Sequence, residues 1–315
     1  MALEFSSRKE TFPNYRVWET TLAGRPFVVE TGKMCGLSNG SCLVRYGETV
    51  VLCNVTMSEK PREGIDFFPL SVEFEEKLYA VGRIPGSFMR REGRPGEKAI
   101  LTSRVVDRPI RPLFPKEMRN DVCVTMTVMS VDQDCSPEIA GMIGTSIALS
   151  ISEIPWKGPI GGVFMGLVDG QLVVNPTLEQ RQNSDLQLTV AATMNKIVMI
   201  EAGANEVDEA TMLEAIKMAH GEIKKIIAFI NGIVAEIGKP KIDFVSMDLD
   251  YDLFTKIRAE YLDDFKAAMD TDDKNVRDAR LLPIQDKLEA EYPDLDDATV
   301  GLIMYKMQKY VVRRW

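Results

Sequence analysis

The spacing of apolar residues predicts β-strands through most of the first two hundred residues. Short runs rich in β-branched residues, separated by turns that contain glycine or asparagine, fill residues 14–60. The runs Phe67–Phe74 and Val122–Val131, and four runs between residues 159 and 203, have the same character. Runs of this length that are bounded by turn residues are typical of strands and hairpins.

Three stretches among these runs predict helices. Glu97–Asp107 lacks turn residues, and we expect this short helix to end against Pro109. A second helix begins at Ser136–Pro137, a hydroxyl cap followed by proline, and continues to about Glu153. Its many small residues would let it lie close to a sheet. A third helix covers Asp208–Ile237. Strands and helices mixed in this order indicate an α+β fold.

The composition changes at Lys239. From there to Val300 the chain has seventeen acidic and nine basic residues and almost no strand pattern. Helical patterns occupy Asp252–Met269, Asn275–Tyr292 and Asp296–Val312. We therefore predict two domains, an α+β domain in residues 1–238 and a small all-α domain in residues 239–315. Solvated helix faces explain the acidic runs better than a divalent-metal site does, because EF-hand spacing is missing. An acidic domain would also repel polyanions.

One segment of this acidic chain is strongly basic. The net charge of the chain is −9, yet between Arg83 and Arg119 ten basic residues stand against four acidic ones, a local balance of +6. The basic residues are Arg83, Arg90, Arg91, Arg94, Lys98, Arg104, Arg108, Arg111, Lys116 and Arg119. Arginine predominates, and its planar guanidinium suits paired contacts with phosphate and stacking on bases. The segment therefore predicts a polyanion-binding site.

The order of residues within the basic segment favours a single-stranded nucleic acid. Four glycines and Pro95 predict a loop that ends at Gly96, and large apolar side chains at its tip stand directly beside arginines. An exposed aromatic ring next to guanidinium groups supplies both a stacking face and phosphate partners. The candidate RNA-binding residues of this loop are Phe88, Met89, Arg90, Arg91 and Arg94.

The predicted helix after the loop carries a second group of candidates, Arg104, Arg108 and Arg111. Arg104 and Arg108 lie one turn apart and therefore on one helix face. These arginines have an alternative role, since they could pair with Asp107 and Glu97 on a solvated face and bind nothing. The sequence leaves the two readings open.

Residue counts exclude several classes of function. The chain has one histidine, His220, which rules out a two-histidine metal site and argues against a serine–histidine–aspartate triad. Walker A spacing is missing. Five cysteines without paired spacing indicate free thiols in a reducing compartment, and we expect the cytoplasm. No apolar run approaches the ~18 residues of a membrane span, and the N-terminus lacks the apolar core of a signal peptide, so we expect no membrane partner.

Two long motifs, DFFPLSVEFEEKLYAVGRIPGSFMRREGRP and RVVDRPIRPLFP, closely resemble the first core domain of the bacterial polynucleotide phosphorylase family. The resemblance continues through PEIAGMIGTSIALSISEIPWKGPIGGV and covers nearly the whole chain. It implies a ribonuclease PH-like core followed by the all-α linker domain. The family's second core and its KH and OB-fold modules are expected to be absent from this chain. The family's loop reads Phe-Phe-Arg-Arg, whereas Met89 here replaces the second aromatic residue.

The resemblance also implies a function. The family degrades RNA from its 3′ end with inorganic phosphate as the nucleophile and with Mg²⁺, and it assembles as homotrimers. This chain would then be the N-terminal part of a phosphorolytic 3′–5′ exoribonuclease. It would supply RNA grip and ring architecture, trimerise when the second core is present, and bind single-stranded RNA rather than DNA. The alternative is a stand-alone, non-catalytic RNA-binding or assembly protein.

The catalytic residues implied by the resemblance are missing from this chain. The family's active core uses a serine pair for phosphate, together with aspartates and a lysine. The matching positions here are Asn175 or Pro176, Gln187 and Thr189, and Asp185 is the one carboxylate left. We therefore predict that this chain has no catalytic residue, binds neither Mg²⁺ nor phosphate, and is inactive alone.

Overall fold

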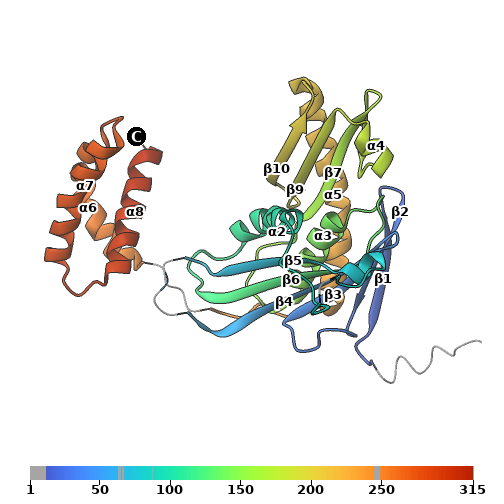
Figure 1. The fold of residues 1–315 in the computed structure, drawn as a ribbon. Coiled ribbons are helices and arrows are strands. Elements are labelled where there is room, and N and C mark those ends of the chain that lie inside the picture. Colours follow the sequence, from blue (N-terminus) through green and yellow to red (C-terminus); the bar gives the residue numbers. More distant parts are fainter. Residues whose placement is uncertain (1–11, 63–64, 66, 87, 245–248, 315) are drawn as a thin grey trace, which may run out of the picture. The chain divides into compact units, whose positions relative to one another are not determined.

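The structure is a computed structural model that describes residues 12–62, 65, 67–86, 88–244 and 249–314 (Figure 1). The N-terminal residues that argued against a signal peptide lie largely outside this range. The chain divides into two compact units, Met1–Val245 and Ser246–Trp315, called here the core unit and the helical unit. Among the described residues, no helix combines the length and apolarity needed to cross a membrane.

The division between the units falls later than the predicted boundary at Lys239. The backbone N–H of Lys239 donates to the carbonyl of Ile151 at 3.0 Å, and that of Ile242 donates to Glu153 at 2.9 Å. Ile151 and Glu153 lie at the end of the helix that begins at Pro137. The Lys241 ammonium donates to three further carbonyls there, those of Leu149, Ser150 and Ser152. The change in composition therefore marks the end of the long helix, and hydrogen bonds hold the next residues on the core.

A six-stranded sheet forms one layer of the core unit. Its strands are β1 (Arg16–Leu22), β2 (Arg25–Thr31), β3 (Gly40–Tyr46), β4 (Thr49–Pro61), β5 (Leu70–Glu76) and β6 (Asn120–Ser130), in the order β1-β2-β3-β4-β6-β5. All neighbours are antiparallel except β5 and β6, which are parallel. Parallel strands need a crossover connection, and here that connection contains the basic segment.

A four-stranded antiparallel sheet forms the second layer, in the order β10-β9-β7-β8. Its strands are β7 (Gly161–Val168), β8 (Gln171–Val174), β9 (Leu186–Ala192) and β10 (Ile197–Ala204). Figure 1 shows the two sheets with helices between and beside them. The strand content and the antiparallel hairpins confirm the predicted α+β class.

Helix α3 (Pro137–Ile151) lies against β3 and β4 on one side and against β7 and α5 (Glu209–Ile237) on the other. Ser136 caps its start by accepting a hydrogen bond from Glu138 N, as the sequence predicts. A Cβ atom on Gly144 would lie 2.5 Å from Cys53 Sγ and 2.9 Å from Val44 Cγ2. The small residues of α3 therefore have the packing role predicted for them, because larger side chains would push the helix off the sheet.

The remaining elements of the core unit are short, apart from α2. They are the 3₁₀ helices η1 (Leu78–Val81) and η2 (Arg111–Leu113), α2 (Glu97–Ile110) and α4 (Leu178–Gln182). Helix α2 extends past the predicted stop at Pro109, because a proline in the last turn removes only one backbone hydrogen bond. The predicted strand Phe67–Phe74 begins instead at Leu70, since Phe68 packs on Phe114 with ring centroids 4.8 Å apart.

The helical unit contains α6 (Tyr251–Met269), α7 (Lys274–Glu291) and α8 (Asp297–Arg314), within two residues of the predicted bounds. It has its own hydrophobic core, with Tyr261 and Phe265 from α6, Leu288 from α7 and Met307 from α8. Because these helices bury a separate set of side chains, the unit is stabilised by its own contacts.

Candidate nucleic-acid interface

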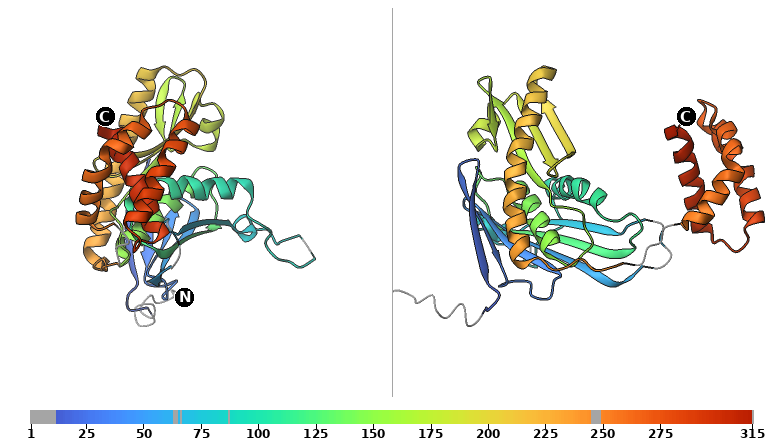
Figure 2. Two further views of the ribbon diagram at one scale, coloured as in Figure 1. Left: turned by 90° about the vertical axis from the view of Figure 1, so that its left-hand side faces the viewer. Right: turned by 180° about the vertical axis from the view of Figure 1, so that it is seen from behind.

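The loop between η1 and α2 projects away from both the sheet and α2 (Figure 2). Phe88 at its tip is 100% exposed and Met89 is 61% exposed. Burying a phenylalanine normally stabilises a protein by about 1.5–3 kcal/mol. A fully exposed ring on a loop therefore contributes nothing to this fold, and its apolar face is available to a ligand.

Three arginines of the same loop follow Phe88 closely in the sequence. Arg90, Arg91 and Arg94 are exposed, and they make no ion pair or side-chain hydrogen bond within the described residues. Arg90 has a φ of 50°, a left-handed conformation that is unfavourable for a side chain of this size. The base of the loop is fixed by a hydrogen bond of 2.9 Å from Leu78 N to the Glu92 carboxylate.

Helix α2 presents its other arginines in three different states. Arg104 is exposed and has no ion-pair or hydrogen-bond partner within the described residues. The Arg108 guanidinium lies 3.5 Å from the Glu201 carboxylate on β10, and both side chains are more than half exposed. Such exposed ion pairs contribute about 0–1 kcal/mol to stability. Arg108 is therefore only loosely engaged and can exchange its partner for a phosphate.

Arg111 is the best-anchored arginine of the second group. It donates to both Asp107 carboxylate oxygens, at 2.9 and 2.7 Å, and to the carbonyls of Phe68 and Leu70, at 3.3 and 3.0 Å. These bonds tie the end of α2 to the start of β5. The alternative reading from the sequence, pairing with Asp107, describes Arg111, whereas it does not describe Arg104.

Other members of the basic segment are also structural. Arg119 is 8% exposed and donates to the carbonyls of Ile65, Lys116 and Met118. Lys98 lies 3.0 Å from Glu138. Among the described residues of the basic segment, the cations without an ion-pair or side-chain hydrogen-bond partner are those of the loop, Arg104 and Lys116.

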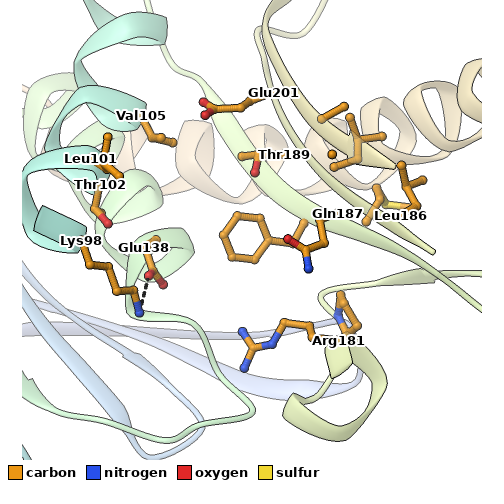
Figure 3. A pocket seen from close by; sticks show the side chains of 16 residues that line it. Lys98, Leu101, Thr102, Val105, Glu138, Arg181, Leu186, Gln187, Thr189 and Glu201 are labelled. Atoms are coloured by element: carbon orange, nitrogen blue, oxygen red, sulfur yellow. Dashed lines mark ion pairs between the residues drawn. The ribbon is translucent and has the colours of Figure 1, made fainter. Parts of the chain in front are cut away.

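A pocket of about 450 Å³ lies between α2 and the four-stranded sheet (Figure 3). Its charged lining residues are Lys98, Glu138, Arg181 and Glu201, two of each sign, and its polar ones include Thr102, Gln187 and Thr189. The sequence analysis identified Gln187 and Thr189 as positions matching the family's catalytic site, and the structure brings them together on β9. It did not identify the Lys98–Glu138 pair, whose members are forty residues apart in the chain.

Glu138 is the most buried acid of this pocket. Burial raises the pKa of its carboxyl, but hydrogen bonding from Ser136 and the charge of Lys98 outweigh burial and hold the pKa below its ordinary value of 4.5. Its side chain is 14% exposed. Glu138 is therefore a stable carboxylate with both oxygens engaged, and a poor proton donor.

Of the other positions that match the family's catalytic site, Pro176 also lines the pocket, whereas Asn175 and Asp185 lie outside it. Asn175 is 4% exposed, and its amide accepts from Phe164 N at 2.8 Å and donates to the Tyr46 hydroxyl at 3.2 Å. Asp185 does not line the pocket and instead accepts from Asn205 at 3.3 Å. Within the described residues, no group of three or more histidine, cysteine or acidic side chains could hold a metal ion. These residues do not fit a Mg²⁺ site.

His220 and the cysteines do not line this pocket. His220 lies on α5, and its Nε2 is 3.1 Å from the carbonyl oxygen of Thr193. All five cysteines are free thiols, and three of them are buried, namely Cys42, Cys53 and Cys135.

Models of protein families agree with this architecture. Residues 23–155 match domain 1 of the 3′ exoribonuclease family, which here comprises most of the six-stranded sheet with α2 and α3. Residues 158–222 match domain 2 of that family, which begins at the four-stranded sheet. The chain belongs to the 3′ exoribonuclease family, and its core unit has the ribonuclease PH fold predicted from the sequence.

Curated relatives narrow the assignment further. The chain is 53% identical over 305 residues to the polyribonucleotide nucleotidyltransferase of Ruminiclostridium cellulolyticum, which covers 96% of this chain and 43% of that protein. It is 55% identical to the enzyme of Alkaliphilus oremlandii, covering 85% of the chain and 38% of the relative. For Clostridioides difficile the identity is 56%, covering 82% and 37%. The chain is thus a homologue of polynucleotide phosphorylase that spans less than half the length of these relatives.

Proposed function

We propose that this chain is the RNA-gripping, non-catalytic part of a phosphorolytic 3′–5′ exoribonuclease that degrades RNA. The observation that carries the proposal is the loop tip, where a fully exposed Phe88 is followed in the sequence by three exposed arginines that have no partner in the described part of the chain. Bases of a single strand can stack on such a ring while its phosphates pair with the arginines. Arg104 and Arg108 extend the same positive charge along α2.

The residues of the pocket support the proposal that this chain binds RNA while catalysis takes place in another part of the enzyme. Phosphoryl transfer needs cations at the phosphate, and commonly a divalent metal held by carboxylates. Here Gln187 and Thr189 stand where the family places charged groups, and Asp185 lies outside the pocket. In the whole enzyme, Mg²⁺ and phosphate would therefore act at another core. Homotrimeric assembly with that core, and a location in the cytoplasm, belong to the same proposal.

Binding of a fluorescent single-stranded RNA, measured by anisotropy over a range of salt concentrations, tests the grip. Changing both Arg90 and Arg91 to alanine removes two phosphate contacts, so the log-log salt slope should fall by about 1.4. If the plots of log affinity against log salt concentration for the unchanged chain and the variant meet near ~1 M salt, the affinity of the variant at about 0.1 M salt should be lower by roughly 25-fold. Phe88→Ala should weaken binding by about 1–3 kcal/mol, the energy of one stacked base. Met89→Phe should strengthen it slightly.

The matched control changes Lys217 and Lys224 to alanine. Both lysines are exposed on α5 and have no partner among the described residues, so the net charge changes equally. An equal loss of affinity in the control, or no loss in the loop variant, would contradict the proposal.

A second experiment separates the proposal from a stand-alone catalytic core. The chain, supplied with RNA, phosphate and Mg²⁺, should release no nucleoside diphosphate. Release that is abolished by Asp185→Ala would show that this core has its own chemistry. Retained RNA binding without release fits both the non-catalytic part of an enzyme and the alternative of a separate RNA-binding protein. If release is recovered when the part of the relatives that this chain does not cover is added, the chain is the non-catalytic part of an enzyme.

A further inference from the structure

The last helix of the helical unit has a charge opposite to that of its surroundings. The unit as a whole, Ser246–Trp315, has sixteen acidic and eleven basic residues. Between Lys306 and Arg314, however, α8 carries four basic residues and no acidic one. The acidic surface predicted from composition therefore does not extend over this part of the unit.

These basic residues line a shallow hollow between α6 and α8. Its volume is about 260 Å³. It is lined by Phe254, Lys306, Lys309, Tyr310, Arg313 and Arg314, which include no acidic side chain. Phe254, Lys306, Lys309 and Tyr310 are half-buried, while the two arginines are exposed. The hollow thus has an apolar floor and a positively charged rim.

Aromatic rings lie beside several cations at or near this hollow. The guanidinium carbons of Arg258 and Arg314 lie 5.0 and 5.1 Å from the centre of the Tyr310 ring. The Lys309 ammonium lies 5.6 Å from the Tyr305 ring. A ring stabilises a cation without neutralising its charge and without using its N–H donors. These N–H groups can therefore still donate to an anion.

Three cations elsewhere on the same unit, Lys266, Arg277 and Lys287, are instead paired with carboxylates. Lys266 lies 3.0 Å from Asp263, and Arg277 lies 3.2 Å from Asp278. Those pairs leave little net charge at the surface. The contrast separates α8 from an ordinary solvated helix face, on which basic and acidic side chains alternate.

We propose that this face, formed by Arg258, Lys309, Arg313 and Arg314, is a second contact for the phosphates of single-stranded RNA. The inference rests on the proposed RNA-binding function and extends it to the helical unit. Guanidinium groups that lie beside a tyrosine ring keep their N–H donors for phosphates. A shallow hollow whose lining has no acidic side chain suits a phosphate backbone without sequence preference.

The test measures the salt dependence of RNA binding to the full chain with Arg313 and Arg314 both changed to glutamine. Loss of two phosphate contacts should lower the log-log slope by about 1.4 and weaken binding roughly 25-fold at about 0.1 M salt. The matched control changes Lys266 and Lys274 to glutamine, since these exposed lysines lie on α6 and α7 of the same unit. It should leave the slope unchanged.

A further variant guards against loss of structure in the last turn of α8. Lys309→Gln lies within the helix and should lower the slope by about 0.7, with unchanged circular dichroism. Both glutamine variants are repeated together with the alanine changes at Arg90 and Arg91. If the loop variant alone binds RNA normally and the α8 variant alone binds RNA more weakly, the loop proposal is wrong and the proposal for α8 stands.

An unchanged slope in the α8 variants would overturn the proposal, and so would a loss equal to that of the control. If RNA binding is unchanged but poly-glutamate binding depends on Arg313 and Arg314, the face accepts an acidic polypeptide and the RNA assignment is wrong.

Discussion

Replacing Arg111 with alanine should destabilise the core unit and leave RNA binding nearly intact. Arg111 makes two hydrogen bonds to the Asp107 carboxylate and two to the carbonyls of Phe68 and Leu70. A hydrogen bond to a charged group contributes about 1.5–3 kcal/mol when it is sheltered, but an exposed ion pair contributes about 0–1 kcal/mol. The Arg111 side chain is 42% exposed, so we expect a total loss of about 2 kcal/mol.

Urea unfolding followed by tryptophan fluorescence measures this loss. Trp156 is a suitable reporter because its ring is buried and its Nε1 donates to the Ile110 carbonyl at 3.1 Å, one residue before Arg111. The control is Arg104→Ala on the same helix. That change should alter stability by less than about 0.5 kcal/mol, because Arg104 is exposed and has no partner in the described residues.

The RNA measurements should show the reverse order. Arg104→Ala should lower the salt slope by about 0.7, and Arg111→Ala should leave it unchanged at temperatures where the variant is folded. A stable Arg111→Ala variant with a reduced slope would refute the reasoning, since Arg111 would then be contacting RNA rather than holding α2 to β5.

Two further predictions concern packing and acid stability. Gly144→Ala should destabilise the core unit by about 1–3 kcal/mol in the same urea assay, because its Cβ would lie 2.5 Å from Cys53 Sγ. Gly232→Ala, with nothing within 4 Å of the new atom, should stabilise α5 by about 1 kcal/mol. Changes of the same sign in the unfolding free energies of the two variants would contradict the packing argument. The pKa of Glu138 lies below its ordinary value, so its contribution is present above about pH 4.5 and is lost as the pH falls below that value. Lys98→Met removes one cause of the lowered pKa, and the acid-unfolding midpoint, followed by circular dichroism, should move to higher pH; an unchanged midpoint would mean that the pair does not affect stability.

The sequence predicted the elements of the fold well because most of them are specified locally. The strands of both sheets bury apolar side chains, and the start of α3 is set by Ser136 and Pro137 at adjacent positions. The predicted and observed bounds differ where contacts with residues distant in the sequence determine the structure. Phe68 leaves the strand pattern to pack on Phe114, and Lys239 is held by Ile151. No local pattern contains those partners.

In the candidate site, too, the local sequence could not predict which charged side chains have partners. Arg104 and Arg111 are seven residues apart, and one is free among the described residues while the other makes four hydrogen bonds. Two of the acceptors of Arg111 are carbonyls more than forty residues upstream. The sequence could therefore identify a positive segment but could not separate its binding residues from its structural ones.

The helical unit extends this argument from single residues to whole surfaces. Its acidic composition predicts repulsion of RNA, yet a phosphate does not respond to the total charge of a domain. Charges are screened over about 10 Å at ~0.1 M salt, which is less than the length of any of the three helices. A phosphate beside Arg313 would interact mainly with the cations that line the same hollow, Arg314 and Lys309 among them. The net charge of the unit then sets its long-range attraction for RNA, while the side chains gathered on α8 set whether RNA is held once it arrives.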